Sequence, residues 1–267
     1  MQVEIVDRMP GRRRLHAMSR RERGLPVLGG GGGSTFVPSQ AAGYFDEFIG
    51  DSATAAAWTS IFGTTSMVQA VGANQPTILT ADINGHKAVA YNGTTQYQES
   101  STWGMNGSAN WTWYMVYCNL GTVPFGGVMY GSTGGGGTRV SFRLDQQDPG
   151  SLDNGFLRLE RTGTNSIPNN GATWSVDTRP GGAGQGYHIA AGRHGPTANE
   201  FFVDGVSRGT WTNSDQLCYA FLTIGRYQAG ILNTNFKTPH ALNFNAFHND
   251  TTMGQMTTYL RTRYALS

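Results

Sequence analysis

The stretch YHIAAGRHGPTANEFFVDGVSRGT occupies residues 187–210. Residues 187–191 alternate between apolar and small or polar side chains, which is typical of a strand with one buried face. The Gly-Pro pair at 195–196 predicts a turn, because glycine allows positive φ and proline cannot donate to a sheet. Asp204 and Gly205 fit a two-residue type I′ turn, which needs positive φ at both positions. The stretch therefore predicts three short antiparallel strands with a tight tip.

The composition supports a β-rich protein. The chain has 267 residues, of which 38 are glycine, about twice the usual share of about 7%. Only 13% of the residues are charged, against a usual share of about 25%. These values favour short strands joined by tight turns over a helical bundle, in one large β domain or two small ones. No run approaches ~18 apolar residues, so we expect no membrane span. The N-terminus has no apolar core of a secretory signal.

Other segments continue the strand pattern. Residues 110–120 are apolar on both faces, which predicts a central strand and places Trp111 and Trp113 in the core. Alternation predicts further strands near residues 140–144, 157–159, 174–176 (with Trp174 in the core), 222–224 and 241–248, whereas residues 53–62 fit a helix or a strand. Asp250 is a candidate cap for a closing helix. Its apolar face has helical spacing and consists of Met253, Met256, Leu260 and Tyr264.

The order of these motifs along residues 40–267 resembles laminin-G-like domains of the concanavalin A-like lectin/glucanase superfamily, of the kind found in phage virion proteins. The segment QPT at 75–77, the INGHKAVAYNGTTQY segment at 83–97, the Gly-Arg pair at 225–226 and the closing helix contribute to it. The resemblance of the central hairpin is carried by Tyr187, His188, Phe202, Val203, Asp204, Gly205 and Val206. It implies an all-β fold, an antiparallel β-sandwich of the jelly-roll kind, over residues 36–267.

Residues 1–35 have the composition of a basic, glycine-rich docking arm and linker. The first 24 residues hold seven arginines and three acids, about +4, so with a net charge of +2 the remainder is about −2. Residues 1–7 fit a short strand through Val3 and Ile5, and residues 12–23 fit a short helix. Ordering the pentaglycine at 29–33 costs about 5–10 kcal/mol, so we expect the arm to be fixed only against other subunits. The predicted docking residues are Arg12, Arg13, Arg14, Arg20, Arg21 and Arg23.

The arginine cluster also allows nucleic-acid binding, because arginine neutralises phosphate. Acids are mixed into the arm and the rest of the chain is slightly acidic, so we favour subunit docking.

The sequence predicts a protein that is not an enzyme. Glycosidases need two carboxylates about 5–9.5 Å apart, and the Glu-x-Asp-x-x-Glu run of the superfamily's glucanases is missing. Asp46 and Glu47 are adjacent, so in a strand they face opposite ways. A Gly-x-Ser-x-Gly elbow is also missing.

We expect no cofactor. The histidines have no cysteine partners at zinc spacing, and Cys118 and Cys218 are interpreted as buried free thiols. Calcium remains possible, since many laminin-G domains bind it at the sandwich rim. Asp46, Asp51 and Asp204 are then the candidate oxygen donors, without a motif that supports them.

Glycan binding is the more specific functional hypothesis for the domain, because sugar faces stack on exposed aromatic rings. Trp103, Tyr130, Trp211 and Tyr227 lie in loop-like contexts and are the candidates; alternatively, they pack loops onto the sandwich. We predict a bacteriophage virion structural protein (head decoration or fibre, or neck or tail accessory subunit), present in several copies or as a homo-oligomer. Its partners are other virion subunits and host glycans. The alternatives are a stand-alone bacterial carbohydrate-binding module or adhesin, and a polysaccharide-degrading enzyme.

Overall fold

The chain divides into two units, Met1–Ser34 and Thr35–Ser267, and the described residues all lie in the second unit. A computed structural model describes residues 36–41, 43, 45–100, 103, 109–120, 126–132, 140–145, 156–161, 165–167, 186–195, 199–211, 221–227 and 232–267. The six predicted docking arginines and the predicted strand at 174–176 lie outside these residues.

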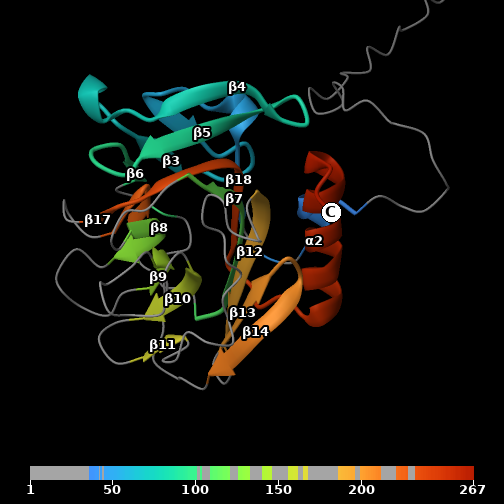
Figure 1. The fold of residues 1–267 in the computed structure, drawn as a ribbon. Coiled ribbons are helices and arrows are strands. Elements are labelled where there is room, and N and C mark those ends of the chain that lie inside the picture. Colours follow the sequence, from blue (N-terminus) through green and yellow to red (C-terminus); the bar gives the residue numbers. More distant parts are fainter. Residues whose placement is uncertain are drawn as a thin grey trace, which may run out of the picture. The chain divides into compact units, whose positions relative to one another are not determined.

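Two eight-stranded antiparallel sheets form the body of the second unit (Figure 1). Sheet A has the order β14-β13-β12-β7-β18-β5-β4, and β1 also pairs with β18. Its strands are β1 (Phe45–Ile49), β4 (Thr77–Ile83), β5 (His86–Asn92), β7 (Trp111–Asn119), β12 (Tyr187–His194), β13 (Asn199–Val203), β14 (Val206–Trp211) and β18 (Asn235–Phe244).

Sheet B has the order β11-β10-β9-β8-β15-β6-β3-β2. Its strands are β2 (Ala57–Thr59), β3 (Ser66–Val68), β6 (Gln98–Ser100), β8 (Gly126–Ser132), β9 (Val140–Asp145), β10 (Phe156–Arg161), β11 (Asn165–Ile167) and β15 (Phe221–Ile224). A third, two-stranded sheet pairs β16 (Arg226–Tyr227) with β17 (Leu232–Asn233). The described helices are α2 (Asp250–Tyr264) and the 3-10 helices η1 (Pro38–Gln40), η2 (Gly50–Ser52) and η3 (Gly72–Asn74).

The core has two parts, one on each face of sheet A. Between the sheets, Trp113, Met115 and Tyr117 of β7 pack with Leu222 and Ile224 of β15. On the outer face, Tyr114 and Val116 of β7 pack against α2, which Figure 1 shows in red beside β12 and β14. Every residue of β7 is therefore buried, because layers cover both faces of this central strand. The predicted all-β sandwich with a closing helix is confirmed.

The turns follow from local chemistry. The β13–β14 connection is Asp204-Gly205, with φ of 53° and 75°, and the β4–β5 connection is Asn84-Gly85, with φ of 45° and 79°. Positive φ at both central positions is the type I′ requirement, and Asn, Asp and Gly tolerate it best. The predicted type I′ hairpin at residues 204–205 is confirmed.

The C-terminal boundaries differ from the prediction. Strand β18 ends at Phe244, and the helix cap is Asn249, whose side chain accepts a hydrogen bond from the Thr252 amide at 2.9 Å. Asp250 is instead the first helical residue, where its charge complements the positive end of the helix dipole. Residues 57–59 form a strand. The predicted helical face is confirmed, since Met253, Met256, Leu260 and Tyr264 are buried. No helix in the described part of the chain is long and apolar enough to cross a membrane.

Candidate functional site

A groove of about 500 Å³ lies between the start of α2 and the outer face of the β13–β14 hairpin. Strand alternation builds one wall. Phe201 and Val203 point towards sheet B, so Glu200 and Phe202 point towards the helix. Ser207 of β14 stands opposite Phe202 in the sheet. The groove therefore collects polar side chains above an apolar floor.

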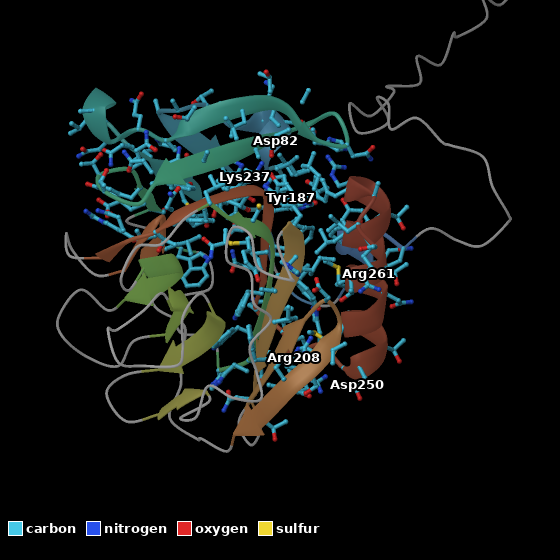
Figure 2. All side chains as sticks on the ribbon, in the orientation of Figure 1. Asp82, Tyr187, Arg208, Lys237, Asp250 and Arg261 are labelled. Carbon is cyan, nitrogen blue, oxygen red and sulfur yellow. The ribbon has the colours of Figure 1, made fainter. Side chains whose placement is uncertain are left out.

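Helix α2 supplies the other wall of the groove. Asp250, Met253, Gly254 and Thr257 lie along one helix face, at the three- and four-residue spacing of neighbours in a helix. Figure 2 shows Asp250 at the N-terminal end of α2, beside β14. Gly254 has no side chain, and a Cβ built there would meet nothing within 4 Å. This position leaves the groove open.

Arg193 is the charged centre of the groove. It stands opposite Glu200 in the β12–β13 register, and their side chains are only 11% and 13% exposed. Its Nε and Nη2 donate to Glu200 Oε2 at 3.1 and 2.5 Å. Its Nη1 donates to the His248 carbonyl at 3.0 Å and lies 2.7 Å from Asp250 Oδ1. The guanidinium also lies over the Phe202 and Phe247 rings, 5.2 and 4.9 Å from their centroids. Arg193 thus joins β12, β13 and the start of α2.

The groove offers mainly hydrogen-bond acceptors. Glu200 Oε1 accepts a short hydrogen bond from the Ser207 hydroxyl and keeps further acceptor capacity. Asp250 is 88% exposed, and in the described part of the chain its Oδ2 has no partner. Among the described residues, the ionisable side chains of the lining are one arginine and two carboxylates, so this part of the lining carries one net negative charge.

The hairpin tip is fixed against α2. Arg261 Nη2 donates to the Asp204 carbonyl at 3.0 Å, and a Cβ on Gly205 would lie 3.1 Å from Thr257 Cγ2. The Asp204 carboxylate accepts from His188 Nδ1 at 2.8 Å and from the Ile189 amide at 2.9 Å. Burial alone would raise the pKa of Asp204, but these hydrogen bonds outweigh it and the pKa lies below its usual value.

A buried polar cluster ties α2 to the sheet at another point. His240 Nε2 lies 2.9 Å from Glu47 Oε1, and its Nδ1 lies 3.1 Å from the Tyr264 hydroxyl. Burial disfavours the charged ring and lowers the pKa of His240, against the opposing effect of Glu47. His240 and Glu47 are almost fully buried, so this cluster positions the helix and offers no open binding surface.

A further polar cluster joins β4, β12 and β18. Figure 2 labels its members, Asp82, Tyr187 and Lys237. Lys237 Nζ lies 2.8 Å from Asp82 Oδ1, and the Tyr187 hydroxyl donates to the same carboxylate. Burial raises the pKa of Tyr187. Cys118, the neighbour of Tyr187 and Lys237 in the sheet, is a buried free thiol as predicted, and burial raises its pKa. Cys218 lies outside the described residues.

The four predicted glycan-binding aromatics come from different parts of the fold. Trp103 is half-buried and packs against the core between the sheets. Tyr130 lies in β8 of sheet B, Trp211 ends β14 of sheet A, and Tyr227 lies in the two-stranded sheet. Of these four side chains only that of Trp103 lies in the described part of the structure, so the glycan role of the four residues stays a prediction. Trp111 and Trp113 are buried in the core, as predicted.

The carboxylates considered for calcium are all engaged with protein donors. Asp46 accepts from Thr65, and Asp51 accepts from His86 and the Lys87 amide. Asp204 accepts from His188, as described above. The described residues contain no group of three or more metal-binding side chains.

Comparison with known proteins gives a likeness of fold. No family model and no curated protein matches the sequence. Trypanosoma rangeli sialidase matches with a TM-score of 0.56 and 11% identity, over 82% of this chain and 32% of the sialidase. The same sialidase in complex with sialic acid matches with a TM-score of 0.51 and 13% identity, over 85% of this chain and 35% of that one. The chain spans about a third of the length of these sialidases.

A domain of an extracellular arabinanase from Geobacillus stearothermophilus, solved with arabinotriose, also matches, at 12% identity over 81% of this chain and 87% of that one. Its TM-score of 0.41 is too low to carry an argument. The shared feature is a β-sandwich fold, and the phage setting gains no support from these matches.

The prediction that the protein is not an enzyme is corrected by this comparison. It rested on the missing Glu-x-Asp-x-x-Glu run and the missing Gly-x-Ser-x-Gly elbow, which test only two enzyme patterns. Sialidases are enzymes, and part of their chain shares this fold. A missing glucanase pattern therefore does not exclude an enzyme with this architecture.

The sequence did not reveal the groove. No motif singled out Arg193, Glu200 or Ser207, and Asp250 was interpreted as a helix cap. The available signal was the pairing of opposite charges across the β12–β13 connection. Only the position of α2 shows that these side chains line a groove.

Proposed function

We propose that this β-sandwich binds carbohydrate in the groove between α2 and the β13–β14 hairpin. One observation carries the proposal, namely a groove of about 500 Å³ with an apolar floor and several hydrogen-bond acceptors on its walls. A sugar ring presents apolar C–H faces and several hydroxyl donors, which match such a lining. Small-molecule sites commonly combine an apolar surface with a few placed polar groups.

Phe247 adds an aromatic surface beside the groove. Its side chain is 40% exposed, and one face of its ring lies under the Arg193 guanidinium. An exposed ring next to hydrogen-bonding groups provides a platform on which a sugar face can stack. The sequence predicted that a sugar stacks on an aromatic ring. In this proposal that ring is Phe247, which was not among the predicted residues.

Gly254 allows a direct test. Its Cβ direction is open, so Gly254→Trp places an indole in the groove without removing any described contact, while Gly254→Ala adds one methyl. The full chain is titrated with a panel of neutral, amino and acidic oligosaccharides by calorimetry. We expect Gly254→Trp to weaken binding at least tenfold and Gly254→Ala to keep it. Failure of every sugar to bind, or equal binding by Gly254→Trp, contradicts the proposal.

We also propose that residues 1–33 dock the sandwich onto a larger particle, and that this particle is a bacteriophage virion. The basic arm and the resemblance to phage laminin-G-like domains support this setting. Several copies would give weak sugar contacts avidity. Deletion of residues 1–33 should abolish incorporation into particles while the domain stays folded by circular dichroism. Normal incorporation of the truncated chain contradicts the docking role.

Glycoside hydrolysis is the second candidate function. Glu200 and Asp250 place two carboxylates at one groove, bridged by Arg193, and hydrolysis of glycosidic bonds uses a carboxylate pair. Release of reducing ends from the bound oligosaccharides, lost in Glu200→Gln, would support it. A sugar that binds without product release would leave binding as the function.

A further inference from the structure

Resting on the proposed function, we infer that the groove prefers sugars that carry a protonated amino group and disfavours sugars that carry a carboxylate. The inference starts from the ionisable side chains that line the groove, which are Arg193, Glu200 and Asp250. Two carboxylates face one guanidinium, so the lining has an excess of negative charge. A cationic group on the ligand is attracted to this lining, and an anionic group is repelled.

Arg193 is the only cation in the described lining, and most of its donors are already engaged within the protein. Arg193 is only 11% exposed, and four of its five N–H groups are directed at Glu200, the His248 carbonyl and Asp250. A ligand carboxylate could form two parallel hydrogen bonds with this guanidinium only by displacing one of these partners. The positive charge of the groove is therefore used within the protein, where it holds the walls together.

The accessible negative charge is that of Asp250, because the Glu200 side chain is only 13% exposed. Asp250 is 88% exposed at the rim, and its Oδ2 has no partner among the described residues. Glu200 Oε1 faces Ser207 and can accept a second hydrogen bond. Both atoms accept hydrogen bonds and carry charge, which suits an ammonium group with its three donors.

The positive end of the α2 helix dipole opposes this preference, but its charge is smaller than the excess negative charge of the lining. A helix N-terminus carries about half a positive charge, and it favours anions. The carboxylate of Asp250 occupies that position, and the Asn249 side chain already caps the Thr252 amide. One excess full charge outweighs about half a charge of the opposite sign, so the groove stays negative.

The inference separates this chain from its structural neighbour. A sialidase, of which about a third matches this fold, has been solved with sialic acid, a carboxylate sugar. The groove described here should instead favour deacetylated amino sugars, such as glucosamine oligomers, over their N-acetylated forms and over uronate oligomers.

The test compares three oligosaccharides of equal length at pH 6, where a free amino group is protonated. Glucosamine, N-acetylglucosamine and galacturonate tetramers are titrated into the full chain by calorimetry, in low and in high salt. We expect the glucosamine tetramer to bind about fivefold tighter than its N-acetylated form, with galacturonate weakest, since an exposed ion pair contributes about that factor. High salt should shrink the preference.

Two variants with the same change in net charge locate the effect. Asp250→Asn keeps the shape of the side chain and should remove most of the amine preference. Glu99→Gln, on β6 of sheet B, should leave it unchanged. An unchanged preference in Asp250→Asn, or equal binding of the three tetramers, overturns the inference while sugar binding in the groove stands. Failure of all sugars to bind overturns both proposals.

Discussion

Gly192 provides a direct test of how the two core layers are packed. It lies in β12, opposite Trp113 of β7 and Phe201 of β13. A Cβ at this position would lie 2.6 Å from Trp113 Cε2 and Nε1. The indole therefore crosses over the bare backbone of β12. Trp113 is only 2% exposed, so Gly192→Ala forces it to move by about 1 Å within a packed core.

The magnitude follows from two opposing terms. Overpacking a core typically costs about 1–3 kcal/mol, while alanine restricts the unfolded chain and offsets about 0.4–1 kcal/mol of that cost. We expect Gly192→Ala to lower the free energy of unfolding by about 1–2 kcal/mol, which lowers Tm by about 2–8 °C for a domain of this size. Urea unfolding followed by tryptophan fluorescence measures the loss.

Two controls isolate the cause. Gly72→Ala adds a Cβ that meets nothing within 4 Å, so it should not destabilise the protein. In a Trp113→Phe background the smaller ring leaves room, so Gly192→Ala should cost less there than in the parent. An unchanged stability of Gly192→Ala, or an equal loss in both backgrounds, would refute the placement of Trp113 across β12.

Three further predictions concern stability. Gly254→Ala should raise the free energy of unfolding by about 0.5–1 kcal/mol, because alanine is a better residue inside a helix and its Cβ meets no atom within 4 Å; a lower urea midpoint would contradict the open groove. Asn243→Leu should stabilise by about 1 kcal/mol or more, because the buried Asn243 amide has no hydrogen-bond partner in the described structure; destabilisation would show that the amide binds something in solution. The lowered pKa of His240 means that the unfolded chain binds its proton more tightly, so stability should fall as pH drops below about 6.5. Urea unfolding from pH 7 to pH 5 checks this, and His240→Gln should lose most of that slope.

Local chemistry made the central hairpin predictable. Asp204 and Gly205 specify a turn with positive φ, and strand alternation fixes which neighbours face the core. The unbroken apolar run of β7 likewise predicted a strand covered on both faces. These features depend on residues close in sequence, so a single sequence contains them.

The groove depends on contacts between residues far apart in sequence. Arg193 and Asp250 are separated by 57 positions, and nothing in either local pattern indicates that they meet. Glu47 and His240 pair inside the fold across 193 positions, and no local pattern around either residue indicates that they meet. The helix cap at Asn249 was missed for a different reason, because Asn249 and Asp250 are both good caps and the choice depends on where β18 ends.

The walls of the groove are held at both ends, which bears on how a ligand would bind. At the hairpin tip, Arg261 holds the Asp204 carbonyl. At the start of the helix, Arg193 holds the His248 carbonyl and the Asp250 carboxylate. The groove therefore does not need to form when a ligand arrives, and little conformational entropy is lost on binding. Arg193 orders the groove by pairing its guanidinium with groups of the protein. Its positive charge is then neutralised within the walls, so a ligand would meet the remaining carboxylate charge.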